Sequence, residues 1–163
     1  MKTPSNLQLI ALACLSRAQN KRKTLYELMI EVNHIFALAD TPYSPGAFYP
    51  AIKKLSKAKM ININQDGCII EQAGITHLEA SLMRHPLPDS FMGILYRLIA
   101  ASILADRNLR REAVKRIDIE LIKFNQNQSQ AGQGKRRSEL APSFIRQHIS
   151  SCLRRIALDL RDY

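Results

Sequence analysis

Cysteine is scarce in this sequence: the three that occur, Cys14, Cys68 and Cys152, are an odd number and lie far apart. Small proteins that depend on disulfides carry many cysteines at short spacings, so this pattern excludes a disulfide framework and predicts a reducing, cytoplasmic location. No cysteine or histidine has a neighbour at the spacing of zinc ligands. We therefore expect no metal site, and no residue pattern predicts a cofactor.

Long apolar runs are also missing. The longest, residues 91–105, is interrupted by Arg97 and is shorter than the roughly 18–20 residues of a membrane span. The first residues resemble a short signal peptide, but Asn6 and Gln8 break the apolar run and no small-residue cleavage site follows. We interpret them as the first helix of a soluble protein with no membrane partner.

Catalytic motifs are absent as well. The six glycines form no phosphate-binding loop, no nucleophile motif surrounds a serine or a cysteine, and the carboxylates do not cluster. The sequence therefore predicts a protein that is not an enzyme.

Acidic residues are few relative to basic ones: 14 Asp and Glu stand against 24 Lys and Arg, which gives a net charge of +10 over 163 residues. This length suffices for one ordinary domain, or for a small domain with a helical extension. The charge predicts attraction to polyanions, with nucleic acid as the first candidate and an anionic membrane surface as the second.

Two amphipathic helices are predicted before residue 40, the first at about residues 4–17. The second begins at Thr24, because Thr24 and Glu27 form a capping-box pattern. Residues 61–70 predict a hairpin, since isoleucines alternate with asparagines before the turn residues Asp66-Gly67. Thr76 and Glu79 form a second capping-box pattern and predict that another helix begins there.

Between the second helix and the hairpin lies the stretch "SPGAFYPAIKKL", residues 44–55. Its apolar residues Phe48, Ile52 and Leu55 recur at helical spacing, so a third, short helix is expected. Ser44 can cap it, Pro45 suits its first position, and Gly46 permits close approach of the backbone to a phosphate. The opposite face presents a tyrosine and three lysines: Tyr49, Lys53, Lys54 and Lys57.

Three helices, a hairpin and a fourth helix, in that order, are the layout of a winged helix-turn-helix, whose third helix enters the major groove of DNA. The fold class is thus mainly α with a small β-hairpin wing. Lys21 and Lys23, in the run Lys21-Arg22-Lys23, and Asn64 in the hairpin are further candidate DNA-binding residues. For the basic run, a contact to a flanking phosphate and a solvated loop are equally good interpretations.

Pro50 allows two interpretations. A helix that runs continuously from Pro45 would place Pro50 beyond the first turn, where it removes a hydrogen bond at a cost of ~3 kcal/mol. Alternatively, the first turn is irregular and the regular helix begins near Phe48. We favour the second interpretation.

The segment "YSPGAFYPAIKKLSKAKMI", residues 43–61, resembles the recognition segment of PadR-like transcriptional regulators, approximately Ser-x-Gly-x-Leu-Tyr-Pro-x-Leu-x-x-Leu. "LYEL" at residues 25–28 is similar to the family's Gly-Tyr-Glu-Leu, and Ile75-Thr76 to its Leu-Thr. The chain departs from the pattern at Leu25 and Glu79, where glycine is usual, and in a wing tip "NQDG" without Arg or Lys. The matching residues are Ser44, Gly46, Phe48, Tyr49, Pro50, Ile52 and Leu55.

The resemblance covers residues 1–85 and implies a dimeric bacterial regulator with an N-terminal winged helix and a C-terminal helical dimerisation region. Some PadR-like regulators bind small aromatic or drug-like ligands in that region. A small-molecule effector is therefore a further candidate partner here. Because Tyr96 is the only aromatic residue of the first long C-terminal helix that offers a polar handle, a dimer core is the favoured interpretation of the apolar C-terminal helices.

The second half of the sequence predicts helices joined by a polar loop. Residues 89–107 form a strongly apolar helix, and Asn108 can cap the next one, whose apolar residues recur at coiled-coil-like spacing. Residues 125–139 are polar and predict a flexible loop that includes the basic run 135–137, either a phosphate anchor or an idle loop. A last amphipathic helix, at about residues 143–160, either folds back on its own subunit or reaches across a dimer.

The predicted organisation is a winged helix-turn-helix DNA-binding domain at residues 1–86 and a helical dimerisation region at residues 87–163. The predicted function is a sequence-specific, PadR-like transcriptional regulator that binds double-stranded DNA, at an inverted-repeat operator, as a homodimer. The alternative is a protein-interaction module, an anti-repressor or assembly factor, that docks a partner protein. A nucleic-acid-binding adaptor of a mobile element is a third and weaker option.

Overall fold

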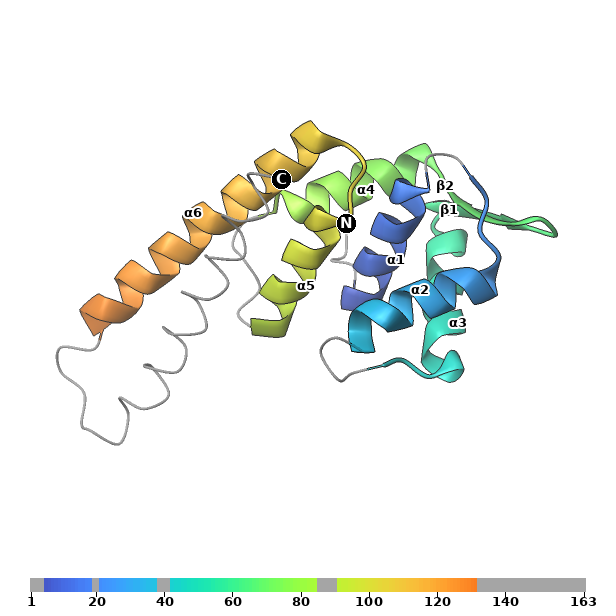
Figure 1. Ribbon diagram of the computed structural model, residues 1–163, viewed down its shortest axis with the longest axis horizontal. Coiled ribbons are helices and arrows are strands. Elements are labelled where there is room, and N and C mark those ends of the chain that lie inside the picture. The colour runs from blue at the N-terminus through green and yellow to red at the C-terminus, as the bar shows by residue number, and fades with distance from the viewer. Residues whose placement is uncertain (1–4, 19–20, 38–41, 85–90, 132–163) are drawn as a thin grey trace.

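The computed structural model describes residues 5–18, 21–37, 42–84 and 91–131. Within them the chain is mainly helical, with one small antiparallel hairpin, as the sequence predicts (Figure 1). The basic run 135–137 and the predicted last helix lie outside the described residues. The elements are α1 (Asn6–Arg17), α2 (Leu25–Ala37), α3 (Pro45–Lys57), β1 (Ile61–Asn64), β2 (Gly67–Ile70), α4 (Gln72–Leu82), α5 (Phe91–Ser102) and α6 (Arg107–Ala131).

Helix α1 is the centre of the core, and α2, α3, α4 and α5 all pack against it. Every residue from Leu9 to Leu15 is buried, so this helix has no solvent face along most of its length. It begins with a capping box that was not predicted from the sequence. The Gln8 N–H donates to Ser5 Oγ at 3.3 Å, and the Ser5 N–H donates to Gln8 Oε1 at 3.1 Å.

Helix α2 begins with the predicted capping box. The Glu27 N–H donates to Thr24 Oγ1 at 3.1 Å, and the Thr24 N–H donates to Glu27 Oε2 at 2.8 Å. The hydrogen bond from the Thr24 backbone N–H holds the pKa of the Glu27 carboxyl below its usual range, and the bond from the Thr24 hydroxyl adds a smaller contribution. The predicted start of this helix is confirmed.

The hairpin is formed as predicted, with Ile61 opposite Ile70 and Asn64 opposite Gly67. A third segment joins it: the Lys23 N–H donates to the Cys68 carbonyl at 3.0 Å, and the Cys68 N–H donates to the Lys23 carbonyl at 2.7 Å. Gly67 has φ +123°, and a Cβ there would lie 2.4 Å from the Lys23 oxygen. Only glycine fits this position, because both the backbone angle and the space exclude a side chain.

Helix α4 begins at Gln72, not at Thr76, so the predicted second capping box is wrong. The Thr76 hydroxyl instead donates to the Gln72 carbonyl at 3.1 Å, one turn back within the helix. The helix starts early because its first turn packs on the base of the hairpin. A Cβ on Gly74 would lie 2.2 Å from the Met60 oxygen, so this close packing requires glycine.

The boundaries of the last two described helices differ from the predicted ones. Asp106, not Asn108, caps α6, because Asp106 Oδ1 accepts from the N–H groups of Asn108 and Leu109 at 2.8 and 2.9 Å. The helix continues to Ala131, so residues 125–131 are not a loop. Glutamine is a good helix former, and the first helix breaker in this stretch is Gly132.

Helix α5 packs against α1, so the core that begins in the first helix continues across the predicted boundary at residue 86. Ile94 and Leu98 of α5, and Leu104 just after it, belong to the same buried cluster as the α1 residues. Helix α6 packs on α5 and extends beyond the other helices that the structure describes (Figure 1). In the described part of the chain, no helix has both the length and the apolarity needed to cross a membrane.

Candidate nucleic-acid interface

Helix α3 is regular from Pro45, so the favoured interpretation of Pro50 is wrong: this proline lies inside the helix. Because proline has no N–H, the Gly46 carbonyl lacks its usual donor four residues along. Ser44 occupies the N-cap position, but its side chain makes no capping hydrogen bond. The backbone carbonyl of Ser44 instead accepts from the N–H groups of Ala47 and Phe48, each at 3.0 Å.

The predicted division of α3 into two faces is confirmed by its burial. Phe48, Ile52 and Leu55 are at most 3% exposed and belong to the core. The residues on the other face are all exposed, including Tyr49 at 43%: Tyr49, Lys53, Lys54 and Lys57. The core therefore holds one side of the helix and leaves a continuous basic face in solvent.

Gly46 lies at the exposed start of α3, and its surroundings are more open than those of Gly67 and Gly74. A Cβ there would meet only Ser44 Oγ, at 3.8 Å, which is an ordinary contact. Nothing in the described part of the chain requires glycine here. Its bare backbone is open to the surroundings at the start of the helix.

The hairpin tip carries amides and one carboxylate. Asn62, Asn64, Gln65 and Asp66 are exposed. The Asn64 side chain takes part in the turn, because its Oδ1 accepts from the Asp66 N–H at 3.0 Å. The tip itself offers no cation, so it is poorly suited to hold a phosphate by charge.

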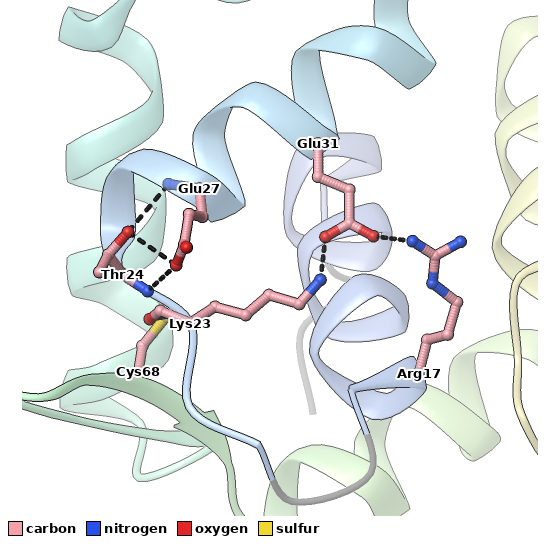
Figure 2. A network of polar contacts seen from close by, with 6 residues as sticks. All are labelled: Arg17, Lys23, Thr24, Glu27, Glu31 and Cys68. Carbon is pink, nitrogen blue, oxygen red and sulfur yellow. Dashed lines mark hydrogen bonds and ion pairs between the residues drawn. The ribbon is translucent and has the colours of Figure 1, made fainter.

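The basic run between α1 and α2 divides into two kinds of residue. Lys21 and Arg22 are exposed. Lys23 is only 21% exposed at its side chain and forms an ion pair with Glu31, which also pairs with Arg17 (Figure 2). The Lys23 ammonium thus has an internal partner, and its backbone holds the hairpin.

The buried thiols support this scaffold and have low reactivity. The Cys68 S–H donates to the Lys23 carbonyl at 3.1 Å, and burial raises the pKa of Cys68. Burial, with a smaller contribution from nearby Glu31, raises the pKa of Cys14 to about 12. Both are thiols rather than thiolates at neutral pH, and the thiolate is the reactive form.

Two exposed residues of α2 were not singled out from the sequence. Tyr26 is 64% exposed and Ile30 is 39% exposed, one turn apart on the side of α2 that faces away from the core. Their signal in the sequence is that they fall outside the apolar stripe of the helix. Tyr96, named above as a polar handle for an effector, is 3% exposed, and its ring lies 4.4 Å from that of Phe36.

In the described residues, no three His, Cys, Asp or Glu side chains lie close enough together to hold a metal ion. What the surface offers is a basic helix face, a bare helix start and a projecting hairpin. Neither a model of a known protein family nor a curated protein matches this chain.

Proposed function

We propose that this protein is a sequence-specific DNA-binding transcriptional regulator of the PadR-like winged-helix type, which acts in the cytoplasm as a homodimer at an inverted repeat. The order of α2, α3 and the hairpin supports this, since a winged helix-turn-helix has the same order. The net charge of +10 supports a polyanionic partner. No catalytic step is part of the proposal.

The observation that carries the proposal is the two-faced helix α3. Its core face is fully buried, while its outer face combines an exposed tyrosine with three exposed lysines. A helix that enters a major groove needs this division, because one side must hold the helix and the other must meet the DNA.

The two halves of the exposed face have different chemistry, and we assign them different roles. Ser44, Gly46 and Tyr49 lie in the first turns and carry hydroxyl groups or bare backbone, so they approach base edges and the nearest phosphate. Lys53, Lys54 and Lys57 lie further along and neutralise phosphates, which fixes the position of the helix. Lys21 adds a flanking phosphate contact, whereas we assign Lys23 to the scaffold.

The C-terminal helices supply the dimer contact in this proposal. Ile119 of α6 is 39% exposed, and α6 extends beyond the other helices that the structure describes. Two such helices from two subunits would bury apolar surface and set the spacing of the two α3 helices. A small-molecule effector that alters this spacing is compatible with the arrangement.

The test is selection of bound duplexes from a random library at near-physiological salt, followed by titration of the best site against a scrambled one. An inverted repeat bound at least ~10³-fold more tightly than scrambled DNA supports the proposal. Selection of no motif contradicts it.

A triple variant locates the interface. Lys53→Ala, Lys54→Ala and Lys57→Ala together should lower the salt slope of binding by about 2.7, since each lost phosphate contact removes ~0.9. The matched control replaces Arg107, Arg111 and Lys115 of α6, which are also exposed, and removes the same charge. Equal losses in the two variants would show that only net charge attracts the DNA.

The second candidate is a protein-interaction module, and the hairpin tip favours it. That tip has an exposed carboxylate, Asp66, and lacks Lys and Arg, whereas a wing laid on a phosphate backbone gains from cations. In this alternative the basic face of α3 docks an acidic partner protein. Duplex DNA would then bind weakly, without sequence preference, and the selection would enrich nothing.

A further inference from the structure

The first turn of α3 has few anchors of its own. Residues 45–47 are exposed, and the first buried side chain of the helix is that of Phe48. The Ser44 side chain makes no capping bond. The direction of this turn therefore depends on how the chain is held immediately before Ser44.

The backbone of Tyr43 is held there by one side chain of α2. Asn33 Nδ2 donates to the Tyr43 carbonyl at 3.0 Å, and the Tyr43 N–H donates to Asn33 Oδ1 at 2.9 Å. The amide thus satisfies both backbone groups of Tyr43 at once. Both bonds are partly buried, which protects them from competition by water.

The ring of Tyr43 is held as well. It meets the ring of Phe36 edge to face at 4.5 Å, and Phe36 is fully buried. The ring of Tyr96 from α5 also packs on Phe36, with the ring centroids 4.4 Å apart. A row of three rings therefore connects the entry of α3 to α5.

We propose that Asn33 is a positioning residue for DNA sequence recognition: its amide clamps Tyr43 and thereby sets the direction of the first turn of α3. This inference rests on the proposed function. Asn33 lies in α2 and not on the exposed face of α3. In this proposal it influences sequence specificity without touching the DNA.

The clamp should affect specific and non-specific binding differently. The first turn approaches base edges, whereas the lysines of the second half contact phosphates in any sequence. The second half is held separately by the buried Ile52 and Leu55. Loss of the clamp should therefore weaken recognition of the selected site and leave the phosphate contacts in place.

The variant is Asn33→Ala, and the matched control is His34→Ala, which changes the adjacent exposed residue of the same helix. We expect Asn33→Ala to bind the selected duplex about tenfold more weakly, the equivalent of one mismatched base pair. Affinity for the scrambled duplex and the salt slope should stay at the wild-type values. His34→Ala should match the wild type in both titrations.

Asn33→Asp covers the case in which the alanine variant does not fold. It keeps the shape and the acceptor for the Tyr43 N–H, but it replaces the donor by an oxygen that faces the Tyr43 carbonyl. We expect the same loss on the selected duplex. An unchanged ratio of specific to non-specific affinity in a folded Asn33 variant would overturn the inference while the proposed function stands.

Hydrogen exchange in the DNA-free protein tests the positioning role of Asn33 separately from the proposed DNA-binding function. The N–H groups of Ala47 and Phe48 bond to the Ser44 carbonyl, so they report on the first turn. Loss of the clamp should speed their exchange and leave that of Leu55 unchanged. If the wild type selects no DNA sequence, the proposed function fails, and unchanged exchange at these two amides would overturn the positioning role independently.

Discussion

Helix α3 and the hairpin follow each other in the chain, yet a glycine has different surroundings in each of them. Gly67, at the start of β2, is enclosed by the backbone of Lys23, whereas Gly46, at the start of α3, has open space around it. The same residue type is a packing requirement in one element and a free surface in the other. Stability and recognition should therefore separate when these two positions are changed.

The largest effect on stability is expected from Gly67→Ala. The added methyl group would lie 2.4 Å from the Lys23 oxygen at a residue with φ +123°. We expect the free energy of unfolding to fall by about 3 kcal/mol from strain and overpacking together. Urea unfolding measures this loss, and a variant as stable as the wild type would show that the hairpin is not held in this way.

The converse change is Gly46→Leu. Leucine favours helices more than glycine, and a Cβ at this position meets only Ser44 Oγ, at 3.8 Å, so the free energy of unfolding should be equal or higher. Its side chain would stand between the helix start and the DNA, and affinity for the selected duplex should fall about tenfold. If both the stability and the affinity remain unchanged, the first turn of α3 is not part of the DNA interface.

The smallest effect is expected from Asp66→Lys at the hairpin tip. If the tip lies along the phosphate backbone, exchange of an anion for a cation should raise the salt slope by about 0.9 and strengthen binding to any duplex. Gly46→Leu should leave that slope unchanged. A salt slope equal to that of the wild type would place the tip away from DNA and would favour a protein partner.

The sequence predicted those parts of the fold that short-range patterns specify. The Thr24–Glu27 box, the hairpin with its Asp66-Gly67 turn and the two faces of α3 all follow from spacings within a few residues. The start of α4 could not be predicted in this way. It depends on the contact of Gly74 with Met60, which brings the helix onto the hairpin.

The candidate site shows the same division. Exposure of the α3 lysines follows from helical periodicity, but the pairing of Lys23 with Glu31 requires knowledge of how α2 lies against the preceding segment. The two hydrogen bonds between Asn33 and Tyr43 likewise connect residues that are 10 positions apart in the chain. A single sequence contains no signal for such pairs, because many geometries are compatible with the same spacing.

The backbone pairing of Lys23 with Cys68 has a consequence for the order of folding. The two residues are 45 positions apart. Their pairing therefore requires the intervening helices and the hairpin to bring these two segments together. The entropic cost of closing such a loop grows with its length. Long-range pairings of this kind slow the folding of small domains. The segment of β2 around Cys68 and the start of α2 should therefore acquire protection late and in the same kinetic phase.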